Sequence, residues 1–301
     1  MMISICLPVY NGERYLPECL DSILRQTFFD FEIVVSYDSS EDGTLDIIKK
    51  YKVKDPRIRL IEHNDKPGLV ENWNRCALHA RGEWIKYMFQ DDLMTPNCLE
   101  TFIKDAVSDK SIYICERVFI IQPEASDDLR DFYQNRLVRI QNLMPERSKL
   151  ESEEVAALVV QMGSQNFIGE PTSFLFKRSA LAEVGFFNKC LIQICDYEMA
   201  LRLSTINGLG YIAEPLIQFR IHGENTSQSN HEEKQFRLLH IDPVIVFHQL
   251  LYDPLYARWR KIPGFTHHIM THYQREKDVI LNNPEHSGQD ILKSLYPSIL
   301  F

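Results

Sequence analysis

The stretch that decides the fold is Ile3-Ser4-Ile5-Cys6-Leu7-Pro8-Val9-Tyr10-Asn11-Gly12, an almost continuously apolar run that ends in a polar turn. Residues 3–9 predict a buried β-strand, because the run is short, apolar and bounded by turn-forming residues. Residues 13–25 then carry leucine and isoleucine at helical spacing, which predicts an amphipathic helix. A strand followed at once by a helix indicates the first half of a βαβ unit.

The same alternation continues up to residue 89. Further strands are predicted at 31–35, 58–62 and 84–89, and further helices at 43–51 and 69–80. This order predicts an α/β fold with a mostly parallel sheet flanked by helices, in which ligands bind at the carboxyl ends of the strands. Later in the chain, residues 127–154 predict a charged surface excursion, 172–176 a strand and 196–204 a helix.

The pattern of the chain changes near residue 230. From residue 231 onward it is compatible with long helices interrupted by prolines and shows no strand alternation. We therefore expect one domain over 1–230 and a helical C-terminal extension over 231–301. The extension mixes basic and aromatic residues, which suits an anionic membrane surface, a solvated helix or a homo-oligomer contact. These residues are Tyr256, Arg258, Trp259, Arg260, Lys261, Phe265, His267, His268, His272, Arg275 and Lys277.

Composition narrows the class of protein. The 301 residues are 45% hydrophobic, enough for a full core, and a net charge of -9 argues against a nucleic-acid partner. Seven cysteines without a C-x-x-C pair predict reduced core thiols rather than disulfides or a zinc site. No signal-peptide pattern or membrane-spanning apolar run is found, so we expect a cytoplasmic protein, with peripheral contact at the inner face of the membrane left open.

Polar side chains follow three of the predicted strands. Tyr10 follows the first strand, where an aromatic ring can stack on a planar base, and Asp38 follows the second, where a carboxylate can accept hydrogen bonds from a base or ribose. Gln90-Asp91-Asp92 follows the strand that ends at Phe89, and paired carboxylates suit a divalent cation. Each cluster alone is also compatible with a turn or a helix cap. Together they indicate one crevice at the edge of the sheet.

These motifs resemble those of the family 2 glycosyltransferases with the GT-A fold. The matching segments keep the order of the family and span about three quarters of the chain. They are residues 8–16, 22–27, 38–44, 80–83 leading to Asp91-Asp92, 169–172, 184–187, 196–202 and 220–227. It implies an inverting transfer of a sugar from a nucleotide-diphosphate sugar, with a UDP-sugar preferred, to an acceptor hydroxyl. It also implies a glycan or lipid-linked acceptor in cell-surface polysaccharide or lipid-linked glycan synthesis.

The resemblance also implies roles for single residues. Asp92 and His222 match ligands of Mn²⁺ or Mg²⁺, and Asp196 matches the general base, with Glu198 as the competing carboxylate. Glu170 is assigned to the acceptor side. Without the resemblance, Asp196 is better explained as a helix N-cap and His222 as a surface histidine. The residues assigned to the nucleotide sugar are Pro8, Val9, Tyr10, Asp38, Lys66, Asn74, Gln90 and Asp91.

Two departures from the family pattern affect the donor end. Tyr37 stands where many relatives have the first carboxylate of Asp-Asp-Gly-Ser, and Phe89 stands where they have the first aspartate of Asp-x-Asp-Asp. In addition, Trp73 stands where many have an arginine before the equivalent of Asn74. Lys66 is the candidate to replace the missing positive charge. A nucleotidyltransferase-like enzyme and an inactive sugar-nucleotide-binding module are the alternatives. The nucleotidyltransferase alternative lacks support because residues 8–13 contain no glycine-rich basic loop.

Overall fold

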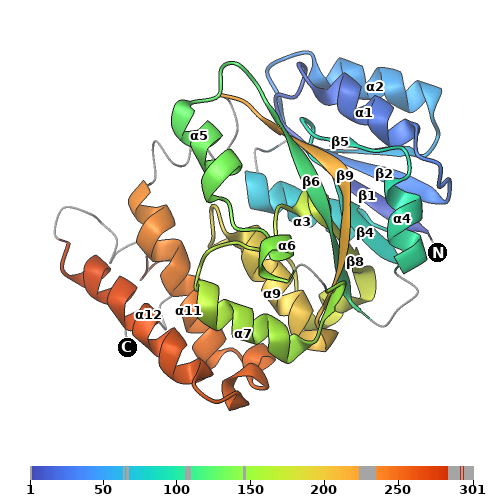
Figure 1. The fold of residues 1–301 in the computed structure, drawn as a ribbon. Coiled ribbons are helices and arrows are strands. Elements are labelled where there is room, and N and C mark those ends of the chain that lie inside the picture. The colour runs from blue at the N-terminus through green and yellow to red at the C-terminus, as the bar shows by residue number, and fades with distance from the viewer. Residues whose placement is uncertain are drawn as a thin grey trace.

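A mixed β-sheet forms the centre of the computed structural model, which describes residues 2–63, 65, 68–105, 110–144, 147–223, 235–283, 292 and 294. The strand order is β3-β2-β1-β4-β8-β6-β9-β5, and β7 pairs with β9 (Figure 1). The strands are β1 (Ile3–Val9), β2 (Phe31–Tyr37), β3 (Ile58–Glu62), β4 (Trp84–Tyr87), β5 (Leu93–Met94), β6 (Ile112–Ile121), β7 (Lys149–Leu150), β8 (Phe174–Lys177) and β9 (Leu209–Ile221).

The first four long strands are parallel, as the sequence predicts. β1 pairs in parallel with β2 on one side and with β4 on the other, and β2 pairs in parallel with β3. Every residue of β1 and of β2 is buried, which is typical of parallel strands covered by helices on both faces. The predicted α/β fold is confirmed, and Val9, Tyr37 and Tyr87 end their strands at the same edge of the sheet.

The expectation of a mostly parallel sheet does not extend to the second half. β8 runs antiparallel to both β4 and β6, and β9 runs parallel to β6. Because β8 runs in the opposite direction, its beginning lies at the edge where β4 ends. The residues that precede β8 therefore join the polar ends of β1, β2 and β4 at one edge.

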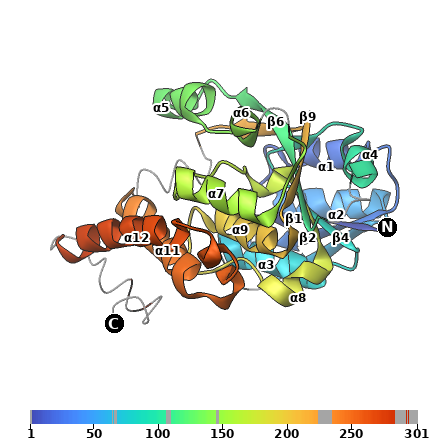
Figure 2. The same cartoon turned by 60° about the horizontal axis from the view of Figure 1, so that its bottom comes forward.

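Helices cover both faces of the sheet (Figure 2). One face packs against α1 (Leu16–Leu24), α2 (Thr44–Lys54) and α4 (Cys98–Asp105). The opposite face packs against α3 (Leu69–His79), α7 (Ser152–Met162) and α9 (Cys195–Asn207). The shorter helices are α5 (Asp127–Asp131), α6 (Ile140–Leu143) and α8 (Leu181–Val184). The predicted helix 13–25 begins only at Leu16, with Pro17 in its first turn, where a missing N–H costs nothing.

The C-terminal helices share the core of the second face. α11 (Asp242–Tyr252) and α12 (Phe265–Leu281) contribute buried residues to the same cluster as α3, α7 and α9. Trp259 is fully buried and donates its indole N–H to Ser152 Oγ at 2.7 Å. The expected boundary near residue 230 falls within 224–234, outside the described residues.

Candidate active site

A pocket of about 460 Å³ opens at the edge where the parallel strands end. Its walls come from all three polar strand ends that the sequence singles out, and also from segments before β8 and before α9. The lining residues are Pro8, Val9, Tyr10, Asp38, Gly68, Leu69, Asn72, Trp73, Phe89, Gln90, Asp91, Glu170, Pro171, Ile192, Gln193, Asp196 and Phe219. The volume is in the range of small-molecule sites.

Gln90 holds the backbone of Tyr10. The Tyr10 N–H donates to Gln90 Oε1 at 3.0 Å, and Gln90 Nε2 donates to the Tyr10 carbonyl at 2.8 Å. Gly12 leaves room for this contact, since a Cβ there would lie 2.5 Å from Gln90 Oε1. The Tyr10 side chain itself is 43% exposed at the pocket. Gln90 therefore positions the tyrosine rather than presenting a free amide to a ligand.

Asp38 forms a second part of the same wall. Its carboxyl is almost fully buried, and burial raises its pKa above the usual range, while backbone N–H groups of Gly68 and Ser39 oppose that rise. Its own N–H donates to the Val9 carbonyl at 2.9 Å, which joins the ends of β1 and β2. Asn72, from the first turn of α3, lines the pocket with a buried side chain.

Asp91 lines the pocket and is contacted by His222, from a distant part of the chain. His222 Nε2 lies 3.1 Å from Asp91 Oδ2, and the Asp91 side chain is 20% exposed. Arg220 fixes this pair, because its Nε donates to the Asp91 carbonyl at 2.9 Å and its Nη2 pairs with Glu18 at 2.6 Å. A carboxylate oxygen suits Mn²⁺ or Mg²⁺, whereas an imidazole nitrogen is a ligand of transition metals, so the pair together suits Mn²⁺ better than Mg²⁺.

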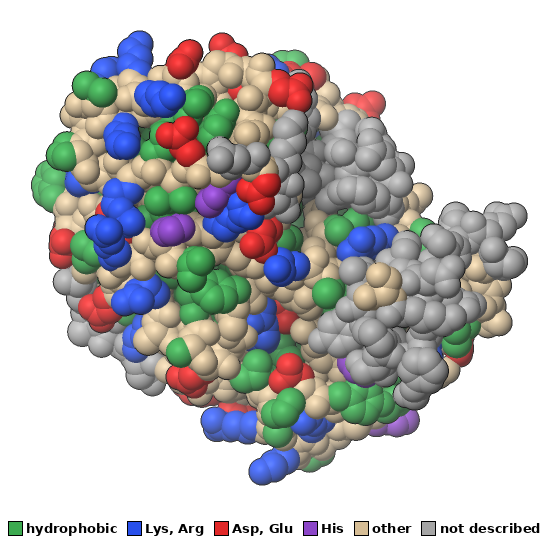
Figure 3. Space-filling model, turned by 180° about the vertical axis from the view of Figure 1, so that it is seen from behind, with side chains coloured by type: hydrophobic (Ala, Val, Ile, Leu, Met, Phe, Trp, Pro, Cys, Tyr) green, Lys and Arg blue, Asp and Glu red, His purple; other side chains and the backbone are tan. Residues whose placement is uncertain are grey.

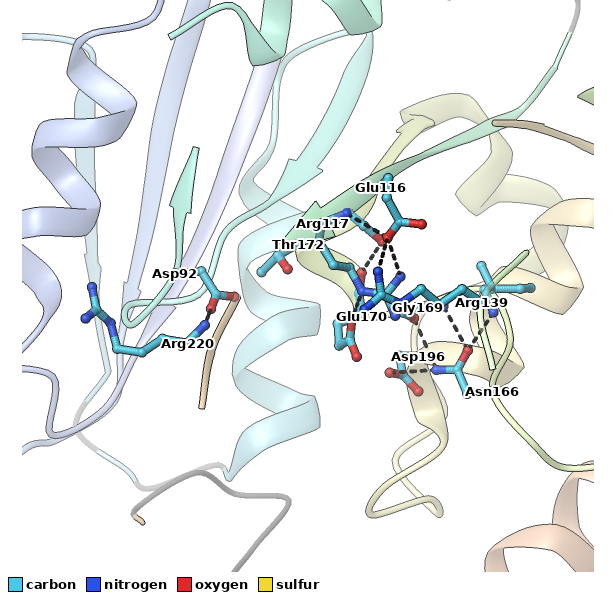
Figure 4. Close-up of polar contacts among 12 residues, drawn as sticks. Asp92, Glu116, Arg117, Arg139, Asn166, Gly169, Glu170, Thr172, Asp196 and Arg220 are labelled. Carbon is cyan, nitrogen blue, oxygen red and sulfur yellow. Dashed lines mark hydrogen bonds and ion pairs between the residues drawn. The ribbon is translucent and has the colours of Figure 1, made fainter. Parts of the chain in front are cut away.

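Asp92 does not lie at the pocket surface, which corrects the assignment of this residue as the metal ligand. Its side chain is fully buried, and Oδ1 accepts the Arg220 N–H at 2.9 Å (Figure 4). Burial, reinforced by the charge of Asp91, raises the pKa of Asp92 well above its usual range. Asp92 anchors the turn after β4 to β9. The residue beside His222 is Asp91, which the sequence analysis assigned to the nucleotide sugar instead.

Asp196 lines the pocket at the start of α9. Its Oδ1 accepts the Tyr197 N–H at 2.6 Å, and its Oδ2 accepts a hydrogen bond from Asn166 Nδ2 at 3.3 Å. Burial is the largest cause that raises its pKa to about 7, and the negative charge of Glu170 adds to it. A carboxylate that titrates near neutral pH is matched to general-base work.

Glu170 lies on the same side of the pocket and pairs with a buried arginine. Glu170 Oε2 lies 2.5 Å from Arg117 Nε, and Arg117 is 3% exposed (Figure 4). Arg117 comes from the part of β6 where the register with β9 shifts. Such a bulge turns a side chain away from its regular direction.

Comparison with known proteins places this arrangement in a family. The sequence model described as glycosyl transferase family 2 matches residues 4–185, which contain the ends of β1, β2 and β4. The chain belongs to glycosyl transferase family 2. This glycosyltransferase domain is 28% identical over 234 residues to the chondroitin synthase of Pasteurella multocida, a match that covers 76% of this chain and 22% of that protein.

Two solved structures show the fold of this glycosyltransferase. Staphylococcus aureus TarS residues 1–349 in complex with UDP-GlcNAc matches with a TM-score of 0.63 and 18% identity, over 99% of this chain and 83% of that one. The mannosyltransferase PcManGT of Pyrobaculum calidifontis, in complex with GDP-Man and Mn²⁺, matches with a TM-score of 0.58 and 18% identity, over 99% and 80%. The predicted GT-A fold is confirmed. The first curated relatives are longer, since the chain spans 66%, 22% and 21% of their lengths.

Two further residues of this glycosyltransferase, Asn74 and Lys66, were also assigned to the nucleotide sugar from the sequence. Asn74 does not line the pocket, because both ends of its amide bond the backbone of Phe187, at 2.9 Å each. Lys66 lies outside the described residues. Trp73 and Phe89 were predicted only as departures from the family, but both form walls of the pocket, where their stacked rings have centroids 4.8 Å apart. Phe219 was not predicted as a pocket residue, because no strand was predicted where β9 lies.

Glu198, the competing candidate for the base, is buried away from the pocket. It is 0% exposed and forms two hydrogen bonds with Arg202 one helical turn later, at 2.6 and 2.7 Å. Arg202 also donates to the carbonyls of Val184 and Phe186. The pair therefore joins α9 to the end of α8, and Asp196 is the carboxylate of this segment that lines the pocket.

The C-terminal aromatic residues do not form a membrane-facing surface. Tyr256, Trp259 and Phe265 are fully buried. Of the neighbouring basic residues, Arg258 pairs with Glu153 and Arg275 with Glu276. On the face drawn in Figure 3, Lys and Arg side chains are interspersed with Asp and Glu. Within the described residues, no helix combines the length and apolar content needed to cross a bilayer.

Proposed function

We propose that the chain transfers a sugar from a nucleotide-diphosphate sugar, preferentially a UDP-sugar, to an acceptor hydroxyl with inversion at the anomeric carbon. The observation that carries the proposal is that one pocket is lined by both Asp196 and Asp91, and that Asp91 is contacted by His222. The two kinds of group serve different ends of a displacement reaction. The fold shared with UDP-GlcNAc and GDP-Man complexes supports the donor class.

The base end of the donor is assigned to the ends of β1 and β2. Tyr10 would stack on the base, and buried Asp38 would accept hydrogen bonds from it. The backbone of Pro8 and Val9 forms the adjoining wall. Gln90 preorganises Tyr10 through its two backbone contacts, so less ordering is needed when the donor binds.

Asp91 and His222 would hold Mn²⁺ or Mg²⁺, and donor phosphate oxygens and water would complete the coordination. The donor set fits, because Mg²⁺-type sites use one or two carboxylates together with substrate phosphates. When bound, the cation offsets the negative charge that develops on the departing nucleotide diphosphate. Without it, that diphosphate would face the Asp91 carboxylate in a protein of net charge -9.

Asp196 is assigned as the general base, on the acceptor side with Glu170. Its carboxylate takes the proton of the acceptor hydroxyl while the acceptor oxygen bonds to the anomeric carbon. The bond between that carbon and the diphosphate oxygen breaks, and the nucleotide diphosphate leaves. Similarity to chondroitin and hyaluronan synthases supports a glycan acceptor, in cell-surface polysaccharide or lipid-linked glycan synthesis at the cytoplasmic side of the membrane.

The test is a donor screen followed by a turnover assay. Calorimetry with UDP and GDP, each with Mn²⁺ and with EDTA, identifies the nucleotide; release of that nucleotide from its sugars with glycan acceptors then measures transfer. We expect Mn²⁺-dependent binding and acceptor-dependent release, and we expect Asp196→Asn to slow the release by about 10²–10⁴-fold while leaving donor binding close to native. Binding without release from any donor would favour the inactive sugar-nucleotide-binding module. Pyrophosphate release from a nucleoside triphosphate and a sugar phosphate would favour the nucleotidyltransferase.

A further inference from the structure

The loop before β8 bends back onto Asp196. Asn166 Oδ1 accepts the N–H groups of Ile168 and Gly169 at 3.0 and 2.9 Å, which folds the loop into a side-chain-stabilised turn. Asn166 Nδ2 donates to the Gly169 carbonyl at 3.1 Å and to Asp196 Oδ2 at 3.3 Å (Figure 4). The amide therefore ties one oxygen of the carboxylate to the loop.

The next residue of this loop that reaches the pocket is Glu170, which is held from behind by Arg117. Arg117 lies between two carboxylates, with Nε 2.5 Å from Glu170 and Nη1 3.6 Å from Glu116. Gly169 has a φ of +122° and leaves room for the guanidinium, since a Cβ there would lie 3.0 Å from Arg117 Cζ. Glu170 is thus a fixed negative charge beside the base, although it makes no hydrogen bond to Asp196 among the contacts of the described chain.

Several charged or titratable groups face Asp196. Glu170, from the loop before β8, raises the pKa of Asp196, and Arg117, from β6, lowers it. Tyr133 and Cys195, the latter next to Asp196 in α9, interact with it electrostatically, but burial raises the pKa of each above its usual range, so both stay neutral near pH 7. Among the described residues, Glu170 and Arg117 are therefore the charged side chains with the largest effect on the pKa of Asp196.

We propose that Asn166 and Glu170 are positioning residues that act on the acceptor hydroxyl through Asp196. Asn166 fixes the direction of the Asp196 carboxylate, and Glu170 places a second negative charge beside it. The part of this inference that concerns sugar transfer rests on the proposed function. The expected effect of the two residues on the proton affinity of Asp196 does not rest on it. The Asn166 amide stabilises the ionised carboxylate, whereas the Glu170 charge destabilises it.

Two isosteric substitutions separate these effects. Asn166→Asp keeps the Oδ acceptor for Ile168 and Gly169, so the turn persists, but it replaces the donor to Asp196 by a negative charge. Glu170→Gln removes the charge and keeps the shape. We expect the pKa of Asp196 to rise in the first variant and to fall in the second, each by about one pH unit.

The controls make the same chemical changes elsewhere. Asn188→Asp alters an asparagine whose Oδ1 accepts the Cys190 N–H at 2.9 Å, in a comparable turn. Glu116→Gln alters the other carboxylate partner of Arg117, and Glu116 does not line the pocket. Both variants are expected to leave the pKa of Asp196 unchanged, even where they lower the stability of the fold.

Two readouts are used on the full chain. The pH dependence of kcat/KM gives the pH below which sugar transfer slows. ¹³C NMR of labelled aspartate carboxyls follows the titration of Asp196, whose signal is assigned by its absence from the Asp196→Asn variant. Opposite shifts in the two variants support the proposal. Shifts of the same sign, no shifts, or equal shifts in the controls overturn it. If the native protein transfers no sugar, the proposed function fails, while the NMR titration still tests this inference.

Discussion

Asp91 Oδ2 lies 3.1 Å from His222 Nε2, although 131 residues separate the two in the chain. The contact depends on β9, because Arg220, near its end, donates to the Asp91 carbonyl through its side chain and to Asp92 Oδ1 through its backbone. The second half of the chain thus completes a site whose first half follows β4. Asp91 and Asp92 are neighbours in sequence, but Asp91 lines the pocket and Asp92 is fully buried.

The first prediction separates these two aspartates. Asp91→Asn should abolish the Mn²⁺ dependence of nucleotide diphosphate binding and weaken it by at least about tenfold, since it removes a metal-facing carboxylate. The Asp92→Asn variant should bind the nucleotide diphosphate as the native protein does, because the amide oxygen of the new asparagine can still accept the Arg220 N–H. Calorimetry with and without EDTA measures both. Loss of metal dependence in Asp92→Asn alone would return the ligand role to that residue.

The second prediction concerns Asp196. Asp196→Asn keeps the shape of the side chain but cannot take the acceptor proton, so kcat should fall by about 10²–10⁴-fold. Donor affinity should stay close to native, because the base acts on the acceptor. Steady-state kinetics together with calorimetry provides the measurement. A variant with normal kcat would exclude Asp196 as the base.

The third prediction follows from the pKa of Asp196, which is raised to about 7. Because the base must be ionised, kcat/KM should rise with pH and level off above this value. Stability should follow the opposite trend: the folded state binds the proton more tightly than the unfolded one, so the free energy of unfolding falls as pH rises from about 4 to 7. Asp196→Asn should lose both trends. Kinetics and denaturant titrations across this range test them.

The fourth prediction concerns the buried pair on α9. Glu198→Gln leaves the Arg202 guanidinium buried without its counter-charge, which should lower the free energy of unfolding by about 3–5 kcal/mol. Glu100→Gln is the matched control, since Glu100 forms an exposed pair with Lys104 at the same spacing, and its loss should change the free energy of unfolding far less. Equal unfolding midpoints for the two variants in urea would contradict this role for Glu198.

The fifth prediction concerns the base-binding end. Tyr10→Ala should raise the donor KM by about tenfold or more, because stacking of an aromatic ring on a base contributes about 1–3 kcal/mol. Its kcat should change little, since the contact is remote from the reacting carbon. Tyr10→Phe keeps the ring and should stay near the native KM. A fall in kcat without a change in KM would place Tyr10 at the reacting centre instead.

The sequence predicted the N-terminal half of the fold well because its strands are short apolar runs separated by helices. It predicted that Tyr10, Asp38 and Asp91 share a pocket, since parallel strands end at one edge. It could not distinguish Asp91 from Asp92, because side chains of adjacent residues point in different directions after a strand, and only the packing of β9 decides which is buried. The same limit applies to Asn74, which lies two residues beyond pocket-lining Asn72 on α3.

The remaining site residues depend on contacts that no local pattern reveals. Arg117 and Phe219 come from β6 and β9, which the sequence analysis did not predict and whose register shifts near Glu116. Asn166 is significant only because its loop meets α9. The aromatic residues around Trp259 suggested a surface, but they fill the core; composition alone cannot tell a buried aromatic from an exposed one.

The burial of Trp259 against Ser152 has a practical consequence for protein engineering. A fragment ending after β9 would lack the indole that packs beneath α7, as well as the apolar faces of α11 and α12. Exchange of this catalytic unit between longer polypeptides would therefore succeed only with a junction placed beyond α12, and hybrids joined nearer the strands would be expected to aggregate.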